Sequence, residues 1–276
     1  MPYLRLRGSE HYYQWIPEPP TDDRPKMVFL HGWGGSGRYW QETARSLADC
    51  YDCFIYDLRG FGRSRLISEE PSDYELETYA DDLAALLDKL NLDRVSLQAH
   101  STGASIAVLF ANRYPQRVDK LILCCSGIFE YDERTFSNFH KASNWVVKLR
   151  PSWLSAIPGM DRLFMARFLH RPIPSVERRA FLEDYIMADG EAALGTVYTA
   201  VSEKAATTMP TEFANLTVPT LLVAGEKDII IPAEMGRKAA NLSDRVEYVC
   251  IPYTAHFPML EDAAAYRDRV RSFLGI

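Results

Sequence analysis

A serine in the stretch from Arg94 to Ala107 has the surroundings of a catalytic nucleophile. An apolar run leads up to Ser101, and a run of small residues that favours a helix follows it. The residues two positions before and two positions after the serine are Ala99 and Gly103. A sharp strand-to-helix turn needs such small residues, because larger side chains would clash with the facing backbone. We therefore interpret the stretch as a nucleophile elbow that presents the Ser101 hydroxyl.

A serine hydroxyl is a poor nucleophile at neutral pH, so it needs a base that takes its proton, and histidine suits that task. The last of the six histidines, His256, follows the last predicted strand. There the carboxyl end of a sheet would bring it beside the elbow. We expect His11 to lie in an opening strand, and His31 precedes a glycine-rich loop. His100 is next to the serine, and His140 and His170 lie in a segment that we expect to be helical.

Short apolar strands and helices alternate along most of the chain. Strands separated by helices predict a doubly wound, mainly parallel α/β sheet. Besides the strand that enters the elbow, we predict strands at 3–7, 11–16, 26–30, 52–56, 118–124, 220–224 and 246–251, and helices at 38–48, 74–90, 233–241 and 261–273.

The alternation stops between about residues 130 and 209, where aromatic residues, Met and Leu follow helical spacing between prolines. Eighty residues without a strand inside such a series indicate an insertion of short helices. We expect a core domain formed by 1–129 and 210–276, and a helical cap or lid at 130–209. This cap would follow the sixth strand and fold over the carboxyl ends of the sheet.

Composition is that of an ordinary globular protein of one large or two small domains: 276 residues, 47% hydrophobic and 25% charged. The formal net charge of -6, without a cluster of lysines or arginines along the chain, gives no reason to expect nucleic-acid or anionic-lipid binding. The first seven residues lack the apolar core of a signal peptide, and no segment has the length of a membrane span. We expect a cytoplasmic protein, and a homodimer stays open.

The five cysteines are predicted to be reduced structural thiols. An odd number argues against a disulfide framework in a chain of this length. Cys50 and Cys53 form a C-x-x-C pair, but no second pair stands at zinc spacing. No metal and no cofactor are expected.

Five motifs, in order and at the ends of predicted strands, resemble those of the capped α/β-hydrolase superfamily. The resemblance covers nearly the whole chain apart from the cap, and it implies the fold predicted above. The motifs are His31–Gly35 (HGWGG), Asp57–Ser64 (DLRGFGRS), Ala99–Gly103 (AHSTG), Gly225–Asp228 (GEKD) and Ala255–Phe257 (AHF).

The histidine needs a carboxylate that orients it and stabilises the imidazolium formed during attack. Asp228 follows the strand at 220–224, which is where the resembled fold presents its acid. Glu226 lies two residues away, on the opposite side of an extended backbone. Glu130 and Asp132 occupy the site that some relatives use instead. We predict Asp228 as the acid.

An oxyanion hole must stabilise the negative charge of a tetrahedral intermediate. The Thr102 N–H follows the nucleophile at a helix N-terminus, whose dipole also favours an anion. The second N–H should come from the loop after Leu30, and the resemblance assigns it to Trp33.

Two other motifs have competing interpretations. Gly32 to Tyr39 nearly matches a phosphate-binding loop, but Arg38 and Tyr39 replace its lysine and its hydroxyl residue. Ser64 has no small residues framing it, so we interpret the loop with its glycines and Arg59 as a tight turn that shapes the floor of the site.

The cap is expected to choose the substrate. About two-thirds of its aromatic and Met side chains should bury against each other, and the rest should line an apolar pocket for an acyl chain or a ring. The candidate pocket residues are His31, Trp33, His100, Trp145 and Phe257.

These residues lead to the hypothesis of a cofactor-independent serine hydrolase that acts on a small-molecule acyl substrate. Ser101 attacks a carboxylic ester or related acyl bond, His256 moves the proton, Asp228 orients the histidine, and water releases the acyl-enzyme. Lactone or thioester hydrolysis and carbon–carbon bond hydrolysis stay open, whereas a serine disfavours the similar dehalogenases and epoxide hydrolases, which use aspartate.

Two further alternatives remain. Trp33 together with Ser101–Gly103 looks like the cofactor-free haloperoxidase or perhydrolase group, although Ala99, Gly34 and Ala104 depart from its pattern. A ligand-binding protein that kept the fold and lost turnover belongs to another class.

Overall fold

A computed structural model describes residues 2–21, 23–67 and 73–276. Within this part, nine strands form one mixed sheet in the order β1-β2-β4-β3-β6-β7-β8-β9, with β5 paired to β2. The strands are β1 (Tyr3–Leu6), β2 (Ser9–Ile16), β3 (Lys26–Leu30), β4 (Asp52–Tyr56), β5 (Arg65–Leu66), β6 (Val95–His100), β7 (Val118–Cys124), β8 (Thr220–Gly225) and β9 (Val246–Ile251).

The pairs from β4 through β9 are parallel, and β2 joins β4 antiparallel. Successive side chains of a strand point to opposite faces. In β3, Val28 and Leu30 therefore enter one core cluster, and Met27 and Phe29 enter the other. Because helices cover both faces, the central strands read as continuous apolar runs. The predicted doubly wound α/β fold is confirmed.

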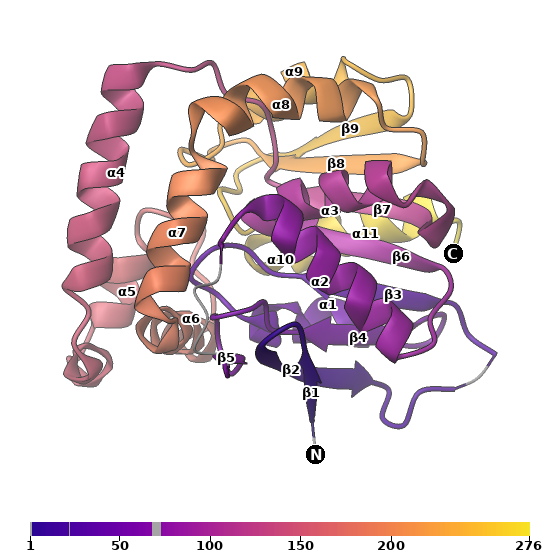
Figure 1. The fold of residues 1–276 in the computed structure, drawn as a ribbon, viewed down its shortest axis with the longest axis horizontal. Helices are drawn as coiled ribbons and strands as arrows, with labels where there is room; N and C mark the ends of the chain where they lie inside the picture. The colour runs from indigo at the N-terminus through magenta and orange to yellow at the C-terminus, as the bar shows by residue number, and fades with distance from the viewer. Residues whose placement is uncertain (1, 22, 68–72) are drawn as a thin grey trace.

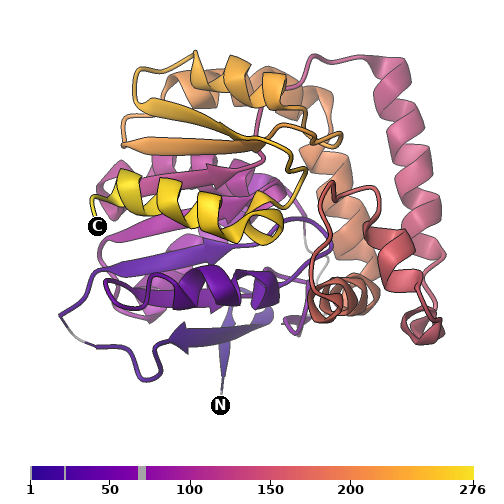
Figure 2. The same cartoon turned by 180° about the vertical axis from the view of Figure 1, so that it is seen from behind.

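Helices α2, α3 and α8 cover one face of the sheet (Figure 1), and α1 and α11 cover the other (Figure 2). The helices and 3-10 turns outside the insertion are η1 (Gly37–Trp40), α1 (Gln41–Arg45), α2 (Leu76–Lys89), α3 (Thr102–Arg113), η2 (Pro115–Arg117), α9 (Ala233–Ala240), α10 (Pro258–Glu261) and α11 (Ala263–Leu274).

Only helices and a 3-10 turn lie between β7 and β8, and we call residues 133–214 the helical insertion. Its elements are α4 (Glu133–Lys148), η3 (Ser152–Ala156), α5 (Met160–Met165), α6 (Ser175–Met187), α7 (Gly190–Ala200) and α8 (Glu203–Ala214). In both views α4 is the outermost helix, far from the sheet (Figures 1 and 2).

Several details differ from the predicted elements. The two-residue strand β5 was not predicted, so the insertion follows the seventh strand rather than the sixth. The expected helix at 38–48 is a 3-10 turn followed by the short α1, and the expected terminal helix is divided at Asp262, which caps α11. Helix α8 runs through the predicted domain boundary at 209/210, with Pro210 inside it.

Candidate active site

Ser101 stands alone between the last residue of β6 and the first residue of α3. Its backbone has φ 53° and ψ -122°, a conformation that is strained for a residue with a side chain and typical of functional turns. A Cβ on Gly103 would lie 2.5 Å from the His31 carbonyl oxygen, so this position needs glycine. Ala99 is fully buried, whereas Ser101 is partly exposed. The turn therefore holds the hydroxyl where a substrate can reach it.

Ser101, His256 and Asp228 form one hydrogen-bonded line. The Ser101 Oγ lies 3.2 Å from His256 Nε2, and His256 Nδ1 lies 2.8 Å from Asp228 Oδ2. Asp228 Oδ1 accepts the backbone N–H groups of Ile230 and Ile231, at 2.8 and 3.1 Å. An ionised Asp228 holds the proton of His256 on Nδ1, which leaves Nε2 free to accept from the serine.

The electrostatics of this line suit proton transfer. Both His256 and Asp228 are buried. Burial acts to lower the pKa of His256, but the adjacent Asp228 carboxylate outweighs it and raises that pKa above its usual 6.5. The carboxylate therefore stabilises the imidazolium that a proton transfer from Ser101 would produce.

Two backbone N–H groups near the serine have no hydrogen-bond partner in the part of the chain that the structure describes. Within the described residues, neither the Trp33 N–H nor the Thr102 N–H bonds to another protein group. Thr102 is the first residue of α3, where N–H groups have no partner within the helix. Trp33 follows Gly32, where a Cβ would lie 3.1 Å from the Ser101 Cβ.

A second chain of hydrogen bonds, which sequence reasoning missed, connects the elbow to the histidine loop. His100 Nε2–H donates to the His256 carbonyl oxygen at 2.8 Å. His100 Nδ1 accepts from the Tyr39 hydroxyl at 3.0 Å, and that hydroxyl accepts the Gly32 N–H at 2.5 Å. Burial, with His256 nearby, keeps the pKa of His100 well below 6.5. His100 is therefore neutral and points away from the Ser101 hydroxyl.

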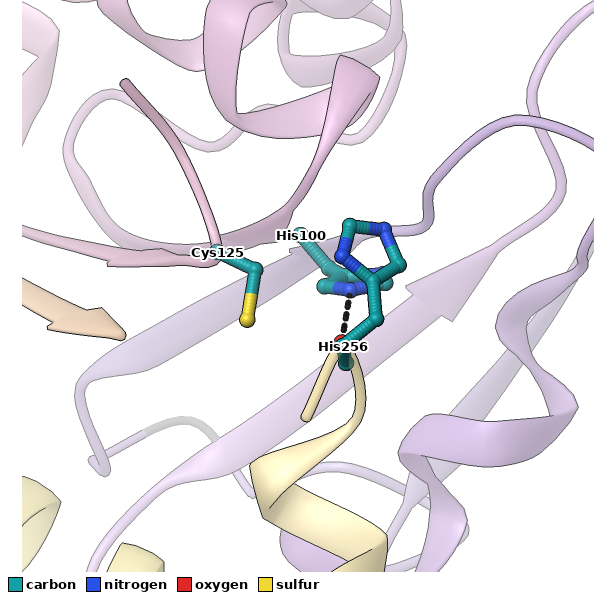
Figure 3. A group of neighbouring side chains, drawn as sticks. All are labelled: His100, Cys125 and His256. Atoms are coloured by element: carbon teal, nitrogen blue, oxygen red, sulfur yellow. Dashed lines mark hydrogen bonds between the residues drawn. The ribbon is translucent and has the colours of Figure 1, made fainter. Parts of the chain in front are cut away.

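His100, Cys125 and His256 are the one group within the described residues whose ligand atoms could surround a metal ion (Figure 3). The Cys125 thiol lies against the Ala255 carbonyl oxygen, 3.7 Å away. All ring nitrogens of both histidines are engaged in the hydrogen bonds given above. These side chains therefore fit the hydrogen bonds around Ser101 better than they fit a metal site. All five cysteines are unpaired.

The competing carboxylates lie in other contacts. Glu226 accepts the Tyr253 N–H at 2.9 Å at the surface. Glu130 pairs with Lys238 at 3.0 Å, and Asp132 caps α4. None of the three bonds to His256.

The five expected pocket residues lie in different surroundings. His31 and His100 are buried and hydrogen-bonded to the protein, and Phe257 is buried among aromatic rings. Trp33 packs on Tyr185 and donates its indole N–H to the Ala193 carbonyl oxygen. Trp145 is 68% exposed on the outermost helix. Spacing on a helix does not reveal which face turns inward, so the sequence could not exclude it.

The loop at 57–64 is hydrogen-bonded to the glycine-rich loop after β3, by which we mean residues 31–38. Asp57 accepts the Gly37 N–H at 2.8 Å and pairs with Arg63 at 2.7 Å. Arg59 Nε donates to Asp82 of α2 at 2.8 Å. Ser64 donates to the Asp57 carbonyl oxygen at 2.6 Å.

A buried carboxylate of the insertion, also missed from sequence, binds the same glycine-rich loop. Asp184 of α6 accepts the Ser36 hydroxyl on Oδ2 at 2.6 Å, and its Oδ1 accepts the Arg38 Nε–H at 2.9 Å. The Arg38 Nη2 also pairs with Oδ1. Burial raises the pKa of Asp184 to about 6, against the opposing effect of Arg38. The residue that broke the phosphate-loop pattern, Arg38, is thus explained by this pairing.

One surface pocket lies away from the serine. It has a volume of about 360 Å³ and lies between α4 and the turn from α7 to α8, with Phe136, His140, Asn144 and Tyr198 among its lining residues. No residue of the Ser101 line borders it.

Comparisons with known proteins agree with this fold. Residues 25–263 match the family model of the alpha/beta hydrolase fold, and the chain belongs to that family. This confirms the resemblance inferred from the motifs.

Individual similarities are distant. A Pseudomonas syringae protein, named as a candidate carbamate hydrolase, RutD, is 26% identical over 91% of this chain and 94% of its own length. The enol-lactonase of Burkholderia xenovorans is 19% identical with a TM-score of 0.82 over 100% of both chains. The bromoperoxidase of Bacillus anthracis is 21% identical with a TM-score of 0.81, covering 97% of this chain and 96% of its own.

No helix in the described part of the chain is long and apolar enough to cross a membrane.

Proposed function

We propose that this protein is a serine hydrolase that cleaves a carboxylic ester or a related acyl bond through an acyl-enzyme. The hydrogen-bonded line from Ser101 through His256 to Asp228, ending beside two unpaired backbone N–H groups, carries the proposal. Membership of the alpha/beta hydrolase family supports it.

The reaction begins when Ser101 Oγ attacks the acyl carbon and its proton moves to His256 Nε2. The carbonyl oxygen takes the electron pair and is held by the N–H groups of Trp33 and Thr102. His256 then gives the proton to the leaving alkoxide as the carbon–oxygen bond breaks. Water repeats the sequence on the acyl-enzyme and restores the Ser101 hydroxyl. Each backbone donor is worth on the order of 10²- to 10³-fold in rate by comparison with measured donor losses.

We propose that the helical insertion, expected at 130–209, acts as the cap over this site. Asp184 ties α6 to the loop after β3, and the Asp189 N–H ties the start of α7 to the Gly60 carbonyl oxygen at 2.8 Å after β4. Both loops follow the carboxyl ends of their strands, where this fold presents its active site.

A fluorophosphonate probe tests the nucleophile directly. We expect a single adduct by intact mass in the wild-type protein and none in Ser101→Ala. Aryl esters of graded acyl length should be hydrolysed by the wild type and lose most turnover in the variant. An absent adduct together with absent hydrolysis would favour a ligand-binding role, and equal turnover in the variant would remove Ser101 from the mechanism.

The perhydrolase alternative shares the site and is favoured by the fold likeness to a bromoperoxidase. In that reaction peroxide replaces water as the second nucleophile. Halide oxidation with peroxide and acetate, measured beside ester hydrolysis, separates the two. A carbon–carbon bond hydrolase would instead cleave a diketone and leave the aryl esters nearly untouched.

A further inference from the structure

The outer side of α4 and the segment after it form an unusual surface, which we call the cap face and define as residues 139–167. Seven of the sixteen large apolar side chains that are exposed in the described residues belong to it. Four of them are well over half exposed: Trp145 (68%), Leu149 (65%), Trp153 (62%) and Leu163 (70%). Single exposed apolar residues are ordinary, but a cluster of this kind marks an interaction surface.

The geometry of α4 separates its two sides. The helix packs on α7, and its buried residues are Phe136, Ser143 and Val147. With 3.6 residues per turn, Trp145 and Leu149 lie on the opposite side. Figures 1 and 2 both show α4 as the outermost helix, with no element of the chain over this side. The apolar stripe therefore faces away from the protein.

Basic residues flank the stripe. Arg134, Lys141 and Lys148 recur at intervals of seven, so they lie along one line of the helix beside Trp145. These three side chains are exposed, and none forms an ion pair within the described part of the chain. Arg162 and Arg167, further along the chain, are also exposed and form no ion pair there.

Charge on the cap face is opposite to that of the rest of the molecule. Residues 139–167 contain five basic side chains and one acidic one, Asp161, which is buried and pairs with Arg178 at 2.9 Å. The segment is thus +4 in a chain of net charge -6. Glu133 and Glu203 line the pocket near the start of α4, at the end of the helix away from Trp145 and Leu149.

We propose that the cap face docks on the surface of an anionic phospholipid membrane. An amphipathic helix with Trp, Phe and Leu on one side and Lys or Arg beside them lies in the plane of such an interface, with its apolar side in the headgroup and acyl boundary. The basic row meets the negative lipid headgroups, and the tryptophans suit the interfacial depth. A second copy of the chain is a poorer occupant, because a two-fold contact would bring the same positive rows together.

This inference does not depend on the proposed chemistry, and it departs from the expectation drawn from net charge. The overall net charge of -6 is the sum of a basic outer segment and a more acidic remainder. Periodicity shows the basic row, but only the fold shows that the side carrying it is uncovered.

Vesicle co-sedimentation of the full chain tests the proposal. At low salt we expect binding to vesicles of equal parts phosphatidylcholine and phosphatidylglycerol, little binding to phosphatidylcholine alone, and release at high salt because screening weakens the attraction. Tryptophan emission should shift to the blue on binding as Trp145 and Trp153 leave water.

Two double variants divide the contributions. Trp145→Ala with Leu149→Ala, and Lys141→Glu with Lys148→Glu, should each lower the partition coefficient by about 10-fold or more. The matched controls are Leu242→Ala and Arg245→Glu, which change exposed residues just before β9, at the amino edge of the sheet. Unchanged circular dichroism and an unchanged thermal unfolding midpoint would show that each variant is folded.

Absence of binding to the anionic vesicles, or equal loss in the control variants, would overturn the proposal. A concentration-dependent dimer in analytical ultracentrifugation that the cap-face variants abolish, without any vesicle binding, would assign the face to a second copy instead.

Discussion

His100 Nε2–H donates a 2.8 Å hydrogen bond to the backbone carbonyl oxygen of His256. The residue before the candidate nucleophile thus holds the loop that carries the candidate base. Because the Tyr39 hydroxyl occupies Nδ1 of His100, the ring keeps its proton on the nitrogen that faces His256. We therefore expect separate tasks for the two histidines, one positional for His100 and one chemical for His256.

Replacing His100 should loosen His256 without removing it. We expect His100→Leu to lower kcat by roughly 10- to 100-fold with a smaller change in KM, because small misplacement of a base costs rate rather than binding. His100→Gln, whose amide can still donate, should retain more activity. A matched control is His140→Leu, since His140 also contacts a backbone carbonyl, that of Val201, but within the insertion. Wild-type kcat in His100→Leu would contradict the positional role.

The pH dependence of turnover should reflect the pairing of His256 with Asp228. Only neutral His256 can accept the serine proton, so activity rises with pH through its pKa. Since Asp228 raises that pKa, the acidic limb should lie above pH 6.5. Asp228→Asn removes the carboxylate. We expect a much lower kcat in this variant, and the acidic limb of its pH–activity profile should move to lower pH. A limb that stays in place in that variant would show that another group titrates. Measuring kcat/KM from pH 5 to 10 reports the free enzyme.

We expect the pairing of Asp184 with Arg38 to hold the glycine-rich loop after β3 in place. Asp184→Asn at pH 8, where the carboxyl is ionised in the wild type, should lower kcat on the order of 10-fold, because Trp33 lies in the same loop. Glu183→Gln is the matched control, as Glu183 also contacts Arg38 but is 49% exposed. An exposed ion pair contributes little. Equal kcat in both variants would mean that the loop does not need this pairing.

The elbow should be intolerant of a single methyl group at Gly103. A Cβ there would meet the His31 and Leu30 carbonyl oxygens at 2.5 and 3.0 Å, and backbone cannot move aside cheaply. We expect Gly103→Ala to lower the free energy of unfolding by about 1–3 kcal/mol. Gly190→Ala is the control, because the nearest atom to its Cβ would be 3.6 Å away. Denaturant titration measures both, and a Gly103→Ala protein as stable as the control would refute the packing argument.

Much of the fold could be predicted because its signals are local. The strands β3, β4 and β8 are buried on both sides, so they read as apolar runs whatever surrounds them. Short elements such as β5 carry too few residues for a pattern of their own. The division of the terminal helix at Asp262 depends on one capping side chain, which is also too little to form a pattern.

By itself the sequence determined the alternation of strands and helices, the order of serine, acid and histidine, and the small residues around Ser101. These follow from properties that each stretch carries with it: side-chain volume, periodicity and turn chemistry. Only the tertiary structure decided which side chains meet across long separations. It joined His100 to His256 and Asp184 to Arg38, and it turned Trp145 outward, because such contacts depend on how distant elements pack and not on any one stretch.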